Sequence, residues 1–217
     1  MQDLHDAADY LGLKAHKNYT YWHNYVDSLM TSHDFQRQPR HSDAAAVGYG
    51  LGLCKSITCR EKCEAEYKNM TGHTYLSVFW SNTSLNIECG RSSYVYITLP
   101  YWQQHTSNYH EDLGLDEYRK IWQPDWQNLF WDKMKWAIGK GGLERCEMVR
   151  NVTDIMFLGE GGDNPRLKQA ALDAIMSWKG QLSAPKLWVP DAQQKIYLGS
   201  EAAAEMALRI SAPNDDC

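Results

Sequence analysis

The clearest pattern of hydrophobic and polar positions lies in residues 74–99. Apolar residues alternate with polar or aromatic ones in three runs, 74–80, 84–89 and 94–99, and short turn-forming breaks separate the runs. Alternation with a period of two is typical of strands that pack one face on a core. The pattern therefore predicts a three-stranded antiparallel meander, with Asn82 at the tip of its first hairpin.

The second half of the chain has helical periodicity instead. Apolar residues repeat every three to four positions in three segments, 125–138, 143–157 and 165–178. Gly139 is expected to end the first of these helices, and Asn164 to cap the third ahead of Pro165. Further helices are expected over 6–13, 21–30, 57–68 and 201–210, and short strands over 187–189 and 195–198.

These elements predict an α+β fold. The 217 residues are 43% hydrophobic and 23% charged, a composition typical of a globular domain. We expect a single domain over 1–217, with helices packed on a small antiparallel sheet of about three strands and stapled by disulfides. It would consist of an N-terminal helical and loop segment (1–41), the meander (74–99) and a mainly helical part (115–217).

The six cysteines suggest disulfides. They are Cys54, Cys59, Cys63, Cys89, Cys146 and Cys217. Cys59 and Cys63 lie one turn apart on the expected helix 57–68, where neighbouring side chains run parallel and bond poorly to each other. Each is therefore expected to bond elsewhere, and the other pairings stay open. A zinc site that uses this pair is the alternative.

Four N-x-[ST] sequons add to the cysteine pattern, at Asn18, Asn69, Asn82 and Asn151. Even cysteines together with excess sequons favour an oxidising, secretory route, and a cytosolic protein with chance sequons is the alternative. Residues 1–6 do not read as a signal peptide, so secretion implies that a signal has been removed. No apolar run approaches the length of a membrane span.

Charge and motifs narrow the possible partners. The formal net charge is −5 and the basic residues are scattered, which argues against nucleic acid as a partner. The glycines in 48–52 and 139–142 lack the spacing of phosphate-binding loops. No cofactor or metal is expected.

One segment, 101–112, combines histidines and carboxylates on what the pattern predicts to be a loop. A histidine that a carboxylate orients can act as a general base, which makes His105, His110, Glu111 and Asp112 weak catalytic candidates. An ordinary surface loop is the alternative. Glu160 and Asp163 lie in a glycine-rich turn; they too could supply an acid/base carboxylate, although a turn followed by a helix cap is the simpler interpretation.

Aromatic residues are abundant, with nine tryptophans and thirteen tyrosines. Flat aromatic faces bind sugar rings and other extended ligands, because they offer a large contact area at a low entropy cost. Trp126 and Leu129 belong to the apolar stripe of the helix 125–138, whereas Trp131 and Trp136 fall off it. Trp131 and Trp136, with Trp102, are therefore candidate ligand-binding residues, and core packing is the alternative.

Together these features suggest a secreted, disulfide-stabilised glycoprotein that binds an extracellular protein or glycan, in an effector- or toxin-like role. The alternative is an extracellular hydrolase, possibly acting on polysaccharide, that uses carboxylate and histidine chemistry.

Overall fold

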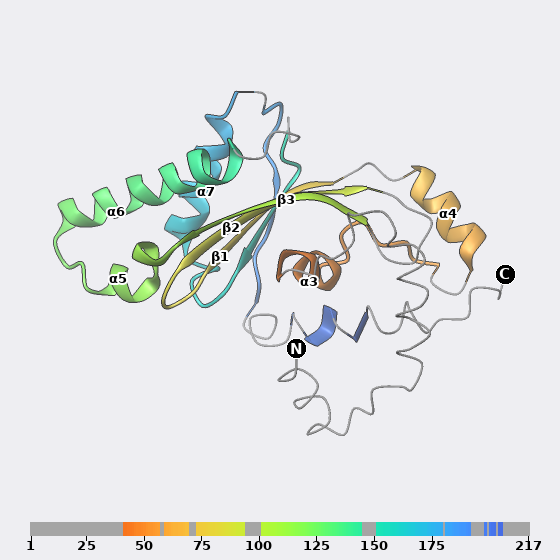
Figure 1. Cartoon of the computed structure of the whole chain (residues 1–217), viewed down its shortest axis with the longest axis horizontal. Coiled ribbons are helices and arrows are strands. Elements are labelled where there is room, and N and C mark those ends of the chain that lie inside the picture. The colour runs from red at the N-terminus through yellow and green to blue at the C-terminus, as the bar shows by residue number, and fades with distance from the viewer. Residues whose placement is uncertain are drawn as a thin grey trace, which may run out of the picture. The chain divides into compact units, whose positions relative to one another are not determined.

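The computed structural model describes residues 41–56, 59–69, 73–93, 101–144, 151–179, 181–191, 198, 200–202 and 204–205 (Figure 1). All of them belong to residues 40–217, the second of the two units into which the chain divides. The helices expected over 6–13 and 21–30 and the strand expected over 94–99 lie outside the described residues. Asn18, Cys146 and Cys217 do too.

Five strands form one mixed sheet in the order β3-β2-β1-β4-β5. The strands are β1 (Thr74–Trp80), β2 (Leu85–Ser93), β3 (Tyr101–His110), β4 (Asp154–Leu158) and β5 (Lys186–Trp188). β1 pairs antiparallel with β2, and β2 with β3, whereas β1–β4 and β4–β5 are parallel pairs. The mixed α and β composition is confirmed, but the sheet has five strands and is not purely antiparallel.

The prediction of a helix over 143–157 is wrong, because residues 154–157 belong to β4, an inner strand of the sheet. All five residues of β4 are buried. A strand covered on both faces is a continuous apolar run without alternation, so its periodicity cannot be distinguished from that of a buried helix.

Helices cover both faces of the sheet (Figure 1). Leu76, Val78 and Trp80 of β1 point into a core shared with α6 (Pro124–Trp136) and α7 (Pro165–Met176). Tyr75, on the opposite face of β1, packs in a second cluster with residues of α3 (His41–Gly48). The meander therefore has a core on both faces rather than on one.

Helix α6 does not end at Gly139 as predicted. It continues directly into the π-helix η2 (Ala137–Leu143). A Cβ at Gly142 would lie 2.5 Å from Cγ2 of Ile87, so the glycine lets the π-helix backbone approach β2 closely. The helix therefore does not break at Gly139, and the glycine needed for close packing on the sheet is Gly142.

Helix α7 follows its sequence signals. Asn164 caps it, and the Asn164 side chain accepts a hydrogen bond from the backbone N–H of Arg166 at 2.9 Å. Its expected apolar stripe is buried at Leu167, Ala171, Ala174 and Ile175. The short 3₁₀ helix η1 (Glu111–Leu113) and α5 (Leu115–Arg119) connect β3 to α6.

A disulfide joins Cys63, on α4 (Arg60–Asn69), to Cys54, with 5.3 Å between their Cα atoms. Cys59 and Cys89 are disulfide-bonded as well. Cys59 and Cys63 are therefore not bonded to each other, as predicted, and neither is a thiolate that could hold zinc. Within the described residues, no helix is both long and apolar enough to span a membrane.

Candidate functional site

Large exposed hydrophobic side chains gather on and just before α6, whereas Tyr109, which is also 57% exposed, lies apart on β3. Trp122 is 83% exposed, Trp126 61%, Leu129 57% and Trp136 57%. At about 100° per residue, the three helical positions 126, 129 and 136 fall within an arc of about 80°. We call these four residues the aromatic face of α6. At 1.5 Å per residue, it extends about 15 Å between Trp126 and Trp136.

The prediction that Trp136 is exposed is confirmed. Trp131, which was also expected to be exposed, is partly buried against the core. Trp126 and Leu129, which were expected to be buried, are exposed. The side chains that α6 buries are Phe130 and Met134, which share an arc with Trp131. The Trp131 ring packs on Trp80, with 5.5 Å between the ring centroids. Two apolar arcs therefore exist on α6, and only the one through Phe130 faces the core.

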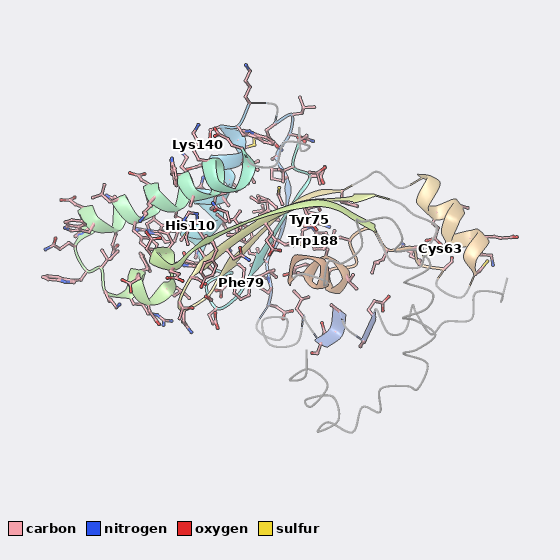
Figure 2. All side chains as sticks on the ribbon, viewed as in Figure 1. Cys63, Tyr75, Phe79, His110, Lys140 and Trp188 are labelled. Carbon is pink, nitrogen blue, oxygen red and sulfur yellow. A yellow bond between two sulfur atoms is a disulfide. The ribbon has the colours of Figure 1, made fainter. Side chains whose placement is uncertain are left out.

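A groove of about 420 Å³ opens at the end of α6, beside the end of α7. Trp136 belongs both to this groove and to the aromatic face. The groove is also lined by Lys135, Lys140, Ser177, Trp178 and Lys179. Lys140 is labelled in Figure 2.

Two of the groove's lysines have carboxylate partners. Nζ of Lys135 lies 3.8 Å from a carboxylate oxygen of Asp173, and Lys140 pairs with Glu144 one helical turn on. Lys179 contacts no carboxylate among the described residues. With three lysines and one glutamate, the lining has a formal charge of +2, although the whole chain is acidic.

The predicted loop 101–112 is instead strand β3 followed by η1. The side chains of Trp102 and His105 lie outside the described residues. His110 is half-buried and its Nε2 lies 3.0 Å from the side-chain amide of Asn108. Glu111 and Asp112 are exposed, and a hydrogen bond from Lys133 lowers the pKa of Asp112. The segment therefore presents a sheet edge and a surface ion pair.

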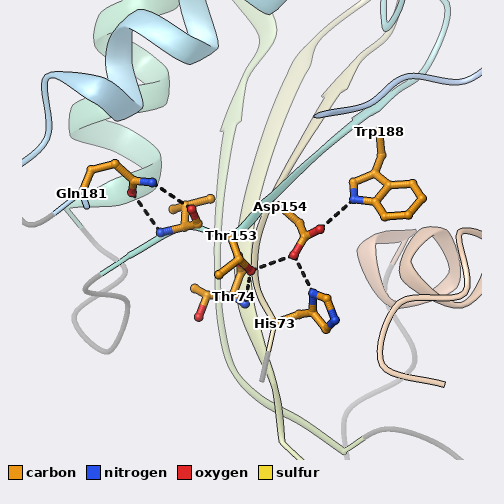
Figure 3. Close-up of polar contacts among 7 residues, drawn as sticks. His73, Thr74, Thr153, Asp154, Gln181 and Trp188 are labelled. Carbon is orange, nitrogen blue, oxygen red and sulfur yellow. Dashed lines mark hydrogen bonds and ion pairs between the residues drawn. The ribbon is translucent and has the colours of Figure 1, made fainter. Parts of the chain in front are cut away.

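A histidine–carboxylate pair does exist elsewhere, between residues that the sequence does not single out (Figure 3). Asp154 is 2% exposed, and its carboxylate lies 2.7 Å from Nδ1 of His73. It also accepts hydrogen bonds from the Thr153 hydroxyl at 2.7 Å and the Trp188 indole N–H at 2.8 Å. Burial alone would raise the pKa of Asp154, but the hydrogen bonds outweigh it and lower this pKa.

We interpret the Asp154 cluster as a structural tie. His73 and Asp154 stand at the amino ends of the parallel strands β1 and β4, and Trp188 is the last residue of the neighbouring parallel strand β5. Ligands of open α/β sheets bind at the opposite, carboxyl ends. Trp188 is also held by Lys186, whose Nζ lies 3.6 Å from the centre of the indole ring. No motif marks the cluster in the sequence, because His73 and Asp154 are 81 residues apart.

At the carboxyl ends of β1 and β4, protein fills the space between the strands and the glycine-rich turn. A Cβ at Gly161 would lie 2.2 Å from Cε3 of the fully buried Trp80 ring. The indole N–H of Trp80 donates a hydrogen bond to the Leu113 carbonyl at 2.7 Å. Glu160 and Asp163 are exposed on the same turn, in agreement with the simpler interpretation of a turn and a helix cap.

Within the described residues, no three His, Cys, Asp or Glu side chains come together as metal ligands would. No protein-family model matches the chain, and no curated protein matches its sequence.

Proposed function

We propose that the chain is a secreted glycoprotein that binds an extracellular polysaccharide through the aromatic face of α6. The observation that carries this proposal is the alignment of Trp126, Leu129 and Trp136 along one exposed flank of a single helix. Burying a large apolar side chain contributes about 1.5–3 kcal/mol, so exposure of several together favours a surface that is covered in use.

A polysaccharide fits this face because of its shape. The face is about 15 Å long and narrow, as the helical rise dictates, and it is not a closed pocket. An extended chain of sugar rings can stack its apolar C–H faces on successive flat side chains. Polar residues at the margin, such as Asp125, Asn128 and Asp132, are exposed and can bond sugar hydroxyls.

The hydrolase alternative has less support. Of its candidate residues, His110 lies at the end of an edge strand and Asp112 is paired with Lys133. His73, whose Nδ1 contacts the buried Asp154 carboxylate, belongs to the structural tie beside the amino ends of β1 and β4. A binding role needs only the exposed face, so we favour it.

Substitution of the aromatic face tests the proposal. W126A and W136A should each lower the affinity for polysaccharide by about 10- to 100-fold, the usual loss for an aromatic anchor. The affinity is measured from retention in native gels that contain the polymer. W126F should restore part of the affinity, because it keeps a flat ring. The polymers are hydroxyethylcellulose, dextran and methyl-esterified homogalacturonan, with their acidic counterparts carboxymethylcellulose, dextran sulfate and de-esterified homogalacturonan.

The matched controls are L182A and M176A, which remove apolar side chains that are 86% and 51% exposed away from the aromatic face. Both should bind like the wild type. Equal binding by W126A, W136A and the wild type, or no binding of the wild type to any polymer, would contradict the proposed function.

The secretory part of the proposal has its own support. The cysteines among the described residues are all in disulfides, which persist in oxidising compartments. Asn82 lies in the turn between β1 and β2, where its Oδ1 accepts a hydrogen bond from Arg119 at 3.2 Å. Its Nδ2, the atom that would carry a glycan, has no partner within the described part of the chain.

We therefore expect protein from a eukaryotic secretory host to lose mass on treatment with an N-glycosidase. N82Q should lose the mass of one glycan, as measured by intact-mass spectrometry. S84A, which removes only the hydroxyl residue of the same sequon, should lose the same mass, whereas T83A, which changes its variable middle position, should leave the mass of the glycan unchanged. Identical masses with and without the glycosidase would contradict the prediction.

A further inference from the structure

We infer that the groove at the end of α6 binds the carboxylate or sulfate of an acidic polysaccharide, with Lys179 as its main cationic contact. This inference rests on the proposed function, since Trp136 belongs to both surfaces. It adds a substrate class to that function: polymers with anionic sugar residues.

The groove is continuous with the aromatic face. Trp136 lies at the end of α6 and is 57% exposed, and it lines the groove together with Trp178 from the end of α7. One indole comes from α6 and the other from the turn that follows α7, and these two helices pack against each other. A sugar chain stacked along α6 therefore reaches the groove at its Trp136 end without leaving an aromatic surface.

The charges of the groove favour an anionic ligand. The lining has a formal charge of +2 in a chain whose formal net charge is −5, so the groove is a local positive region on an acidic protein. Such a region attracts anions and repels cationic partners. Ammonium groups are compact point charges with rotatable donors, which suits the single anionic groups that recur along an acidic polysaccharide.

The three lysines are not equivalent. Lys140 is paired with Glu144, and Lys135 lies near Asp173, so a ligand would have to compete with these carboxylates. Lys179 has no such competitor among the described residues. Ser177, the residue before Trp178, is exposed in the same lining, and its hydroxyl donates a hydrogen bond to the Ala174 carbonyl at 2.9 Å, so towards a ligand it can act as an acceptor.

An acidic polymer is favoured over an acidic peptide by the way the aromatic groups are presented. Both indoles line an open groove beside a helix flank, and neither is at the bottom of a closed apolar pocket of the kind that anchors a protein side chain. Flat, accessible rings next to lysine suit alternating stacking and charge pairing along a repeating chain.

The test compares neutral and acidic polymers with related backbones in affinity electrophoresis. The pairs are methyl-esterified against de-esterified homogalacturonan, hydroxyethylcellulose against carboxymethylcellulose, and dextran against dextran sulfate. The wild type should bind the acidic member of a pair about tenfold more tightly at low ionic strength, and high salt should reduce this preference. K179Q should lose most of the preference, whereas K135Q should lose less.

The control is K120Q, which removes the same charge from a lysine on the connection between α5 and α6, outside the groove. It should keep the wild-type preference, and all variants should keep the wild-type melting temperature. Equal affinity of the wild type for both members of every pair, or an undiminished preference in K179Q, would overturn the inference while leaving the aromatic-face proposal standing. A wild type that binds none of the polymers would overturn both the inference and the aromatic-face proposal. A synthetic polyglutamate peptide that binds as tightly as the acidic polymers would replace the polysaccharide with a protein ligand and also overturn it.

Discussion

Replacement of Asp154 by alanine is expected to lower the free energy of unfolding by about 3 kcal/mol, because hydrogen-bond donors around this buried site lose a charged acceptor. The carboxylate accepts hydrogen bonds from His73, Thr153 and Trp188, and it is 2% exposed. Without it, the indole N–H of Trp188 loses its acceptor. Urea denaturation followed by tryptophan fluorescence at pH 7 measures the change.

The isosteric variant D154N separates charge from shape. An amide keeps one oxygen acceptor in place of two, so D154N should be destabilised by about 1–3 kcal/mol. The matched control is D116N, which removes an exposed carboxylate that pairs with Arg119 at 3.1 Å. Exposed pairs contribute little, and D116N should change stability by less than about 1 kcal/mol. If D154N were as stable as the wild type, the cluster would not be a structural tie.

Asp154 should also make the free energy of unfolding depend on pH in the acidic range. The pKa of Asp154 is lowered from 3.8 in the folded chain, chiefly because its three hydrogen bonds outweigh the effect of burial. Its contribution is therefore fully present above pH 3.8 and is lost as the pH falls through the lower, folded-state pKa. The stability difference between the wild type and D154N should consequently shrink below pH 3.8, which denaturation at a series of acidic pH values would detect.

Local sequence signals were sufficient for some of this fold. The alternation in 74–80 and 84–89 correctly predicts β1 and the start of β2, because one set of side chains enters the core with α6 and α7. Asn164 ahead of Pro165 correctly predicts the start of α7, because capping depends only on neighbouring residues. Both signals lie within a few neighbouring residues, so they can be identified without knowledge of the tertiary contacts.

Other features depend on tertiary contacts, and the sequence alone could not predict them. Strand β4 is buried on both faces, so its apolar run carries no period. On α6 the stripe through Trp126 and Leu129 is as regular as the one through Phe130, and only the position of the sheet decides which is buried. The sequence therefore places Trp126 and Leu129 in the core, although both are exposed. A test for two separate apolar arcs on one helix would have identified the face.

Gly161 gives the second large expected effect. A Cβ there would lie 2.2 Å from Cε3 and 2.6 Å from Cδ2 of Trp80, and the whole tryptophan side chain is buried. The indole cannot move away easily, because it donates a hydrogen bond to the Leu113 carbonyl and packs on Phe130 and Trp131. G161A should therefore lower the free energy of unfolding by about 3 kcal/mol, at the upper end of ordinary overpacking.

A glycine in open surroundings provides the control. The nearest atom to a Cβ at Gly139 is the Cβ of Ala174 at 3.9 Å, an ordinary contact, so G139A should change stability by less than about 0.5 kcal/mol. The cause is tested in a W80F background, where the smaller ring leaves room for the new methyl group. There G161A should cost less than in the wild type, and the difference is the coupling between the two sites. An equal cost in both backgrounds would contradict the prediction that contact with the Trp80 indole makes glycine necessary at 161.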